Sequence, residues 1–351
     1  VDTTVDTTVD IEARLAALEE SGATVMRDID GQVTFLRFRR RSRITDGEVE
    51  LEHLVGLTKL NRLYLDYAHV TDDGLVHLKK LSNLEHLGLN GTKITDDGLE
   101  HIKGLSNLKE LNLASTKTTD DGLQHIKGLS NLEQLYLSST EITDDGLEHI
   151  KGLSNLESLS LSRSKITDDG VEHLKGLANL KSLSLPEITD GGLEHIKGLF
   201  NVESLWLSRS KITGDGLKHL NGLTNLQTLD ISSTKITGDG LTHLNDLTSL
   251  QTLDLNSSKI TDDDLEHLKG LTNLKKLGLA STKITDDGLE YLKEMHNLKQ
   301  LNLFSTNITD AGLEHLKGLT KLESIVLTFT EVTDEGVAEL KQSLPNCRAT
   351  R

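Results

Sequence analysis

Apolar residues return along this chain every 24 residues, with one shortened interval, and polar residues keep equally regular places between them. The repeated pattern is LxxLxLxxTxITDDGLxHLxxLxx. Its first apolar positions are Leu60, Leu84, Leu108, Leu132, Leu156, Leu180, Val202, Leu226, Leu250, Leu274, Leu298 and Leu322. A degenerate unit precedes these twelve, around residues 33–57. Such a period predicts a solenoid, in which each unit buries its apolar face only against its neighbours.

The periodicity changes within each unit. Leu87 and Leu89 alternate about Gly88, which predicts a short strand with one face inward. Three apolar residues then follow at intervals of three between positions 99 and 105, which predicts one buried stripe of a short helix. One strand and one helix per unit wind into a coil whose strands stack as a parallel sheet. Because the strand layer is narrower than the helical layer, we expect the strands on the concave side.

The recurring ITDDGL motif resembles the leucine-rich repeat family, and specifically its TDxGL type, over residues 33–345. This type is found in bacterial repeat proteins and, with Cys at the Thr position, in F-box-associated repeats. The resemblance implies an α/β fold: a right-handed solenoid with a parallel sheet on the concave face and short helices on the convex face. Hydroxyl residues stand where the family often has Asn or Cys, and they can still bond nearby backbone groups. They are Thr92, Thr116, Thr140, Ser164, Ser210 and Thr234.

We divide the chain into four segments. Residues 1–10 are of low complexity and are expected to form a disordered tail or linker. Residues 11–57 are expected to cap the first apolar layer with a short helix, a hairpin about Asp30-Gly31 and the degenerate repeat. The solenoid proper is assigned to residues 58–340, and a C-terminal cap to residues 341–351.

The stretch TDDGLEH at residues 143–149 suggests either a helix N-terminus or a calcium site. Thr143 is well placed as an N-cap, with two aspartates in the first turn, where the helix dipole favours carboxylates. In other copies an aspartate is replaced, at Gly191, Gly214, Gly238 and Ala311, while the threonine persists. A metal cage would lose a ligand at each change, whereas a cap loses little. We therefore interpret the motif as helix capping.

Eleven of the fourteen histidines share one register: His53, His77, His101, His125, His149, His173, His195, His219, His243, His267 and His315. Zinc needs three or four converging ligands, but helices roughly 10 Å apart offer one imidazole each. We therefore interpret the column as packing between repeats. No P-loop, GxSxG elbow, HExxH pair, Cys/His nucleophile or dinucleotide fingerprint occurs. The sequence predicts no enzyme activity, no cofactor and no metal.

The net charge of −17 disfavours nucleic acids and anionic membranes as partners. A single cysteine, Cys347, excludes an internal disulfide, and no stretch of 18 apolar residues occurs. We expect a soluble monomer without membrane insertion, with the cytoplasm slightly favoured. Since the first residue is Val1 and not Met, a processed or excised piece is expected. RFRRRSR at residues 37–43 is interpreted as local neutralisation, with a phosphate- or nucleic-acid-binding patch as the alternative.

A partner is expected on the concave face, where the residue between the two strand leucines points outward. Most members of this column are small or polar, and Tyr64, Tyr136 and Trp206 are its large aromatic residues. Such groups anchor interfaces. The unit from Leu180 lacks two residues and carries Pro186 in a shortened turn. This is either a tolerated deletion or a notch.

The notch hypothesis gives the shortened turn a binding role. Arg163 and Arg209 replace the usual small residue in the neighbouring units and would line the notch, with Glu187 at its base. Arginines beside a tryptophan would suit a carboxylate, a phosphate or an acidic peptide group.

The sequence thus predicts a non-catalytic binding module that recognises a protein or peptide on its concave face. Two alternatives stay open: a structural, self-assembling repeat element, and the targeting, substrate-receptor-like domain of a larger enzyme. The first would use exposed aromatic residues such as Phe304 and Phe329 near one end. The second follows from the resemblance to repeats that accompany F-box segments, although this chain holds no recognisable F-box.

Overall fold

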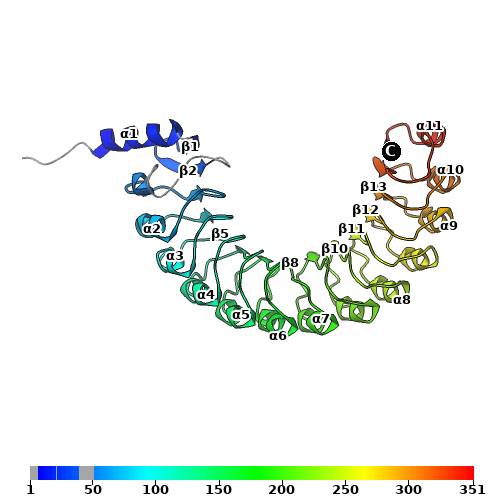
Figure 1. Ribbon diagram of the computed structural model, residues 1–351, viewed down its shortest axis with the longest axis horizontal. Helices are drawn as coiled ribbons and strands as arrows, with labels where there is room; N and C mark the ends of the chain where they lie inside the picture. Colours follow the sequence, from blue (N-terminus) through cyan, green and yellow to red (C-terminus); the bar gives the residue numbers. More distant parts are fainter. Residues whose placement is uncertain (1–6, 21, 39–50) are drawn as a thin grey trace, which may run out of the picture. The chain divides into compact units, whose positions relative to one another are not determined.

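The computed structural model describes residues 7–20, 22–38 and 51–351. They fall into two compact units, unit 1 (Val1–Ile166) and unit 2 (Thr167–Arg351), and each is described by itself. In each unit the strands of the repeats lie on the concave side of that unit and their helical segments on its convex side, whereas the first helix, α1 (Thr7–Glu20), lies at the N-terminal end of unit 1 (Figure 1). This confirms the predicted α/β repeat architecture.

Unit 1 opens with a helix and an antiparallel hairpin, and parallel strands follow, each pairing with the next. Its strands are β1 (Ala23–Arg27), β2 (Val33–Phe38), β3 (Arg62–Tyr64), β4 (His86–Gly88), β5 (Glu110–Asn112), β6 (Gln134–Tyr136) and β7 (Ser158–Ser160). Its helical segments, with η marking 3-10 helices, are α1 (Thr7–Glu20), η1 (Leu51–Leu54), α2 (Asp72–Leu75), η2 (Val76–Lys80), α3 (Asp96–Glu100), α4 (Asp120–Ile126) and α5 (Asp144–Ile150).

Unit 2 consists of parallel strands in sequential order, each again pairing with the next. They are β8 (Ser182–Ser184), β9 (Ser204–Trp206), β10 (Thr228–Asp230), β11 (Thr252–Asp254), β12 (Lys276–Gly278), β13 (Gln300–Asn302), β14 (Ser324–Val326) and β15 (Arg348–Thr350). The helical segments are α6 (Asp168–Val171), η3 (Glu172–Gly176), α7 (Asp190–Ile196), η4 (Gly214–Leu220), α8 (Gly238–Leu241), η5 (Thr242–Leu244), η6 (Asp263–Leu268), α9 (Asp286–Leu289), η7 (Glu290–Leu292), α10 (Asp310–Leu313), η8 (Glu314–Leu316) and α11 (Asp334–Ser343).

The repeated apolar positions form the interior of each unit. In the repeat that begins at Leu84, the side chains of Leu84, Leu87, Leu89, Leu99 and Ile102 are all 0 % exposed. Strand leucines and helix-side leucines therefore meet across one continuous core, as the period predicts. Burying a leucine or isoleucine side chain contributes about 1.5–3 kcal/mol, so the stacked units are held chiefly by this interior.

Several helical segments are short and partly or wholly of the 3-10 type. An α-helical turn such as α2 passes directly into the 3-10 segment η2, and η4 is 3-10 throughout. The apolar spacing of three fits both forms: a 3-10 helix keeps residues i, i+3 and i+6 on one side, and α5 carries the same spacing as an α-helix.

A tight turn follows each strand in the repeats. At Ser115 and Ser139 the backbone takes the left-handed conformation, with φ of 56° and 59°. The next residue closes the turn: the Thr116 hydroxyl donates to the Leu113 carbonyl, and the Thr140 hydroxyl donates to the Leu137 carbonyl, each at 2.6 Å. The predicted bonding of these hydroxyls to nearby backbone is confirmed. The turn fixes where the residues beside the strand project.

Candidate binding surface

The threonine of the acidic motif stands at a helix N-cap position. Its side chain accepts from the first turn of its own helix at Thr189, Thr309 and Thr333, but not at Thr143. Thr143 has the extended backbone of an N-cap, with φ −114°, and makes no side-chain bond to the first turn of α5. Its hydroxyl instead donates to Asp120 Oδ2 in the preceding repeat at 2.6 Å, and its backbone N–H donates to Asp120 Oδ1 at 2.8 Å. The N-cap position of Thr143 is confirmed, but its hydroxyl donates to a carboxylate of the preceding repeat and does not accept from its own helix. Hydrogen bonds to an ionised carboxylate are among the strong ones.

This aspartate–threonine link recurs in both units. The linked pairs include Asp72–Thr95, Asp96–Thr119, Asp120–Thr143, Asp168–Thr189, Asp190–Thr213, Asp262–Thr285, Asp286–Thr309 and Asp310–Thr333. Each carboxylate accepts both the hydroxyl and the backbone N–H of its threonine, the latter at 2.7–2.8 Å. The first aspartate of the motif therefore joins consecutive repeats.

One departure from the motif obeys the same geometry. Where Gly238 replaces the first aspartate, Asp264 of the next unit replaces the usual glycine. Its Oδ2 accepts from the Thr261 N–H at 2.8 Å and from the Thr261 hydroxyl at 3.0 Å. A Cβ on Gly238 would collide with this carboxylate. The aspartate and the glycine are thus interchanged between positions 238 and 264, and Thr261 keeps a carboxylate as its acceptor.

The histidine column lies half-buried along the helical layer, for example at His101, His125 and His149. A half-buried position is in keeping with the interpretation of the column as packing between repeats. Within residues 7–20, 22–38 and 51–351, no three His, Cys, Asp or Glu side chains gather in a way that could hold a metal ion.

The outward column of the sheet is aligned by one-to-one pairing of neighbouring strands. In unit 1 Tyr64 is opposite Gly88, and Asn112 is opposite Tyr136. In unit 2 a row runs from Ser184 through Trp206 and Asp230 to Asp254. Tyr64, Tyr136 and Trp206 are half-buried. The predicted column is therefore confirmed within each unit, and its aromatic side chains offer both fixed position and accessible surface.

Tyr64 belongs to a mixed cluster on unit 1. The Arg37 guanidinium carbon lies 5.0 Å from the Tyr64 ring centroid, and the Phe35 ring centroid lies 5.8 Å away. Burial, with a smaller contribution from Glu110, raises the pKa of the Tyr64 phenol. The carboxylate of Glu110 is itself 2.8 Å from His86 Nδ1. The contacts with Arg37 and Phe35 hold the Tyr64 ring in place.

Tyr136 and Trp206 have different surroundings. The Tyr136 hydroxyl donates to Gln134 Oε1 at 2.9 Å, and burial raises the pKa of this phenol. Trp206 lies directly opposite Asp230, which is opposite Asp254. Burial, reinforced by the charge of Asp230, raises the pKa of the Asp254 carboxyl. Unit 2 therefore pairs an indole with two neighbouring acids on the strand side.

The two arginines of the notch hypothesis occupy the left-handed turn position. Arg163 and Arg209 have φ of 59° and 65°, and both are exposed. Arg163 is in unit 1, whereas Arg209 and Glu187 are in unit 2. Pro186 is buried, and its carbonyl accepts from the Ser210 hydroxyl at 3.1 Å. The notch joining these residues stays a prediction. Of the basic cluster at 37–43, residues 39–43 lie outside the described residues.

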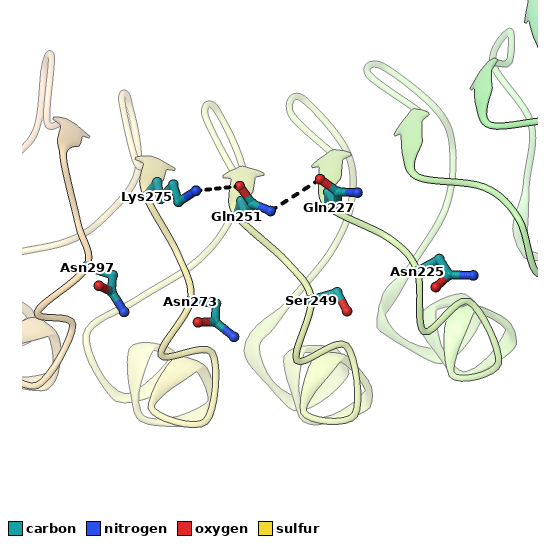
Figure 2. Close-up of a pocket in the computed structure, with 7 residues that line it drawn as sticks. All are labelled: Asn225, Gln227, Ser249, Gln251, Asn273, Lys275 and Asn297. Carbon is teal, nitrogen blue, oxygen red and sulfur yellow. Dashed lines mark hydrogen bonds between the residues drawn. The ribbon is translucent and has the colours of Figure 1, made fainter.

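A polar groove on unit 2 was not foreseen from the sequence. It has a volume of about 440 Å³ and is open to solvent. One wall is formed by Gln227, Gln251 and Lys275, just before the strands, and the other by Asn225, Ser249, Asn273 and Asn297 (Figure 2). The sequence carries one sign of this groove: Ser249 stands at a repeat position that is asparagine in the neighbouring repeats.

The chain was compared with known families and structures. The family model described as "Leucine rich repeat" matches residues 82–142, 130–187, 200–260 and 224–284, more than half of the chain. A second leucine-rich-repeat model matches residues 294–317 and 318–341. The chain belongs to the leucine-rich repeat family. No curated protein matches this leucine-rich repeat chain in a sequence search.

Solved structures share its fold. An internalin from Listeria monocytogenes is 24% identical to this chain, with a TM-score of 0.70. The match covers 97% of this chain and 93% of the internalin chain. A leucine-rich-repeat protein from Leptospira interrogans is 20% identical with a TM-score of 0.61, covering 87% of each chain. A TDR receptor is 16% identical with a TM-score of 0.54, covering 90% of this leucine-rich repeat protein and 58% of its own chain. Across the described part of the chain, no helix has both the length and the apolar character needed to cross a bilayer.

Proposed function

We propose that this leucine-rich repeat protein is a non-catalytic binding module that recognises a protein or peptide on the concave, strand-lined side of its units. The observation that carries the proposal is the outward column with its half-buried Tyr64, Tyr136 and Trp206, held in register by strand pairing. Rigid aromatic side chains on a regular polar sheet are the residues that most often anchor protein interfaces. The fold is shared with a protein named as a receptor, which is in keeping with a binding role.

The finer parts of the proposal rest on individual residues. We assign the chain to the TDxGL type because TDDGL or a near variant begins the helical segment of successive repeats. Trp206 and Arg209, together with Glu187 in unit 2 and Arg163 in unit 1, are proposed to contact the partner. Both arginines are exposed and are held by the turn, so their guanidinium groups are available for a carboxylate.

Self-association is a second candidate, supported by one observation. Phe329 is 76% exposed, and its ring meets that of Phe304 edge-on at a centroid distance of 5.2 Å. An exposed aromatic pair is a suitable contact between copies. Light scattering as a function of protein concentration, on the wild type and on Phe329→Ser, distinguishes a self-assembling element from a monomeric receptor.

The main test uses affinity capture with matched variants. Trp206→Ala/Arg209→Ala removes side chains from the strand side of unit 2, and Glu266→Ala/Lys269→Ala removes an exposed ion pair from its helix side. We expect a specifically captured partner to be retained by the wild type and by the helix-side variant, and to be lost or weakened at least tenfold with the strand-side variant. Equal retention by all three proteins would place recognition elsewhere.

A further inference from the structure

The groove of unit 2 exists because one repeat lacks its asparagine. In the neighbouring repeats the carboxamide Nδ2 of this residue donates to a carbonyl 25 residues earlier, from Asn225 to Phe200 and from Asn273 to Thr248, each at 2.8–2.9 Å. Ser249 stands between them and is too short to make the same bond (Figure 2). The space that a carboxamide would fill is left open between the two asparagines.

The opposite wall is a chain of side-chain hydrogen bonds in which each residue donates to the next, from Lys275 towards Glu203. Lys275 Nζ donates to Gln251 Oε1 at 2.8 Å, Gln251 Nε2 donates to Gln227 Oε1 at 3.2 Å, and Gln227 Nε2 donates to Glu203 at 3.2 Å (Figure 2). Such a chain fixes the orientation of both carboxamides, because each must present its oxygen to one neighbour and its nitrogen to the other. The wall is therefore preorganised.

The charge of the groove differs from that of the protein. The chain has 55 acidic residues, yet none of the groove-lining residues is acidic. In the equivalent column Lys109 pairs with Glu85 at 2.9 Å, and Lys299 pairs with Glu323 at 2.6 Å. Lys275 donates instead to the neutral Gln251 and, within the described part of the chain, makes no ion pair. Its ammonium group is left with an unneutralised charge at the groove.

Carboxamides favour a particular ligand chemistry. After its bond to the backbone, each of Asn225 and Asn273 keeps one N–H donor and one carbonyl acceptor, the pair that a peptide group also presents. The groove contains no aromatic ring on which a sugar could stack. A peptide backbone with unpaired amide groups therefore fits this lining better than a saccharide does.

The spacing of the repeats suits an extended peptide. Asn225 and Asn273 are two repeats apart and lie before their strands, on the helical side of the groove (Figure 2). Neighbouring strands are separated by about 4.8 Å, so the two asparagines are at least about 9.6 Å apart. An extended chain advances about 3.3 Å per residue, so amide groups three or more residues apart can meet both asparagines.

We propose that this groove is a binding site for an extended peptide segment, held by Asn225 and Asn273 across Ser249, with a carboxylate of the peptide on Lys275. The site lies beside the sheet and uses none of the aromatic residues proposed above to contact a partner. A negative binding result at this groove would therefore leave the proposal of recognition on the strand side intact.

The test measures fluorescence anisotropy of a labelled (Glu-Pro-Ala)₃ peptide titrated with the full chain. Ser249→Asn refills the gap with the residue usual at this position, and Ser249→Ala is the matched control that keeps the gap open. We expect saturable binding to the wild type, loss of at least tenfold in affinity with Ser249→Asn, and a change within twofold with Ser249→Ala. Thermal unfolding of each variant checks that it folds.

The carboxylate contact has its own cycle. Replacing Glu by Gln in the peptide should weaken its binding to the wild type three- to tenfold, and Lys275→Gln should weaken binding of the original peptide by a similar factor. Combining the altered peptide with Lys275→Gln should weaken binding no more than either change alone. Equal binding by wild type and Ser249→Asn, or no saturable binding to the wild type, would overturn the proposal. So would binding of maltohexaose in place of the peptide, if Ser249→Asn abolishes it, because the groove would then be a saccharide site.

Discussion

The carboxylate of Asp120 ties one repeat to the next by accepting both the backbone N–H of Thr143, at 2.8 Å, and its hydroxyl, at 2.6 Å. Asp120→Ala removes this acceptor and leaves both donors without their carboxylate. Hydrogen bonds to charged groups contribute about 1.5–3 kcal/mol each, with strong overlap when they share one carboxylate. We expect the free energy of unfolding to fall by about 2–3 kcal/mol, measured by urea denaturation.

The neighbouring aspartate supplies the control for this change. Asp121 is exposed, and it accepts a weak bond from Gln124 at 3.4 Å. Asp121→Ala should change the free energy of unfolding by no more than about 0.5 kcal/mol, the size of a helix-dipole effect at the surface. Equal losses in the two variants would mean that the acids act only through the helix dipole.

Gly238 and Asp264 should behave as one exchangeable pair. Gly238→Asp places its Cβ against the Asp264 carboxylate, and Asp264→Gly removes the acceptor of Thr261. Each single change should lower the free energy of unfolding by about 1–3 kcal/mol. The double variant should recover most of the loss, since the aspartate introduced at position 238 would then accept from Thr261 as in the other repeats. Additive losses in this double-mutant cycle would show that the two positions are independent.

The fold was largely predictable, because the period alone fixes the stacking and the register of the outward column. The aspartate–threonine link was not, because its partners are 23 residues apart and its existence depends on how far one coil advances on the next. The groove was missed for a similar reason. Ser249 for Asn is a mild change locally, and its meaning appears only beside Asn225 and Asn273 in the neighbouring repeats. The repeat fixes where an exposed side chain projects but not which of these side chains a partner contacts, so the choice of contact residues stays a prediction.

Ser249→Asn should stabilise the free protein. The new carboxamide can donate to the Thr224 carbonyl, in the manner of Asn273 with Thr248. One added hydrogen bond corresponds to about 0.5–1.5 kcal/mol. The reverse change in unit 1, Asn131→Ser, removes the bond to the Ser106 carbonyl and should destabilise by a similar amount. Chemical denaturation of both variants tests the pair, and shifts of the same sign would contradict the assigned role of this column.

Asp254→Asn should stabilise the protein near neutral pH. Burial, together with Asp230, raises the folded-state pKa of Asp254 above 3.8, so its contribution to stability is present below that value and is lost as the pH rises through the folded pKa. Because the side chain is only partly buried, solvent screening keeps the gain below about 1 kcal/mol. Unfolding at pH 7 and pH 3 tests this: the difference from wild type should vanish at pH 3. Destabilisation at pH 7 would mean that the charge itself is needed for the fold.

Hydroxyl-radical footprinting of the protein, free and bound to its captured partner, tests most directly where recognition takes place. Tyr64, Tyr136 and Trp206 report on the strand side, and Tyr291 in η7 reports on the helical layer. We expect oxidation of Tyr136 and Trp206 to fall at least threefold in the complex, with Tyr291 unchanged. Protection of Tyr291 with undiminished oxidation of the strand-side aromatic residues would contradict the account.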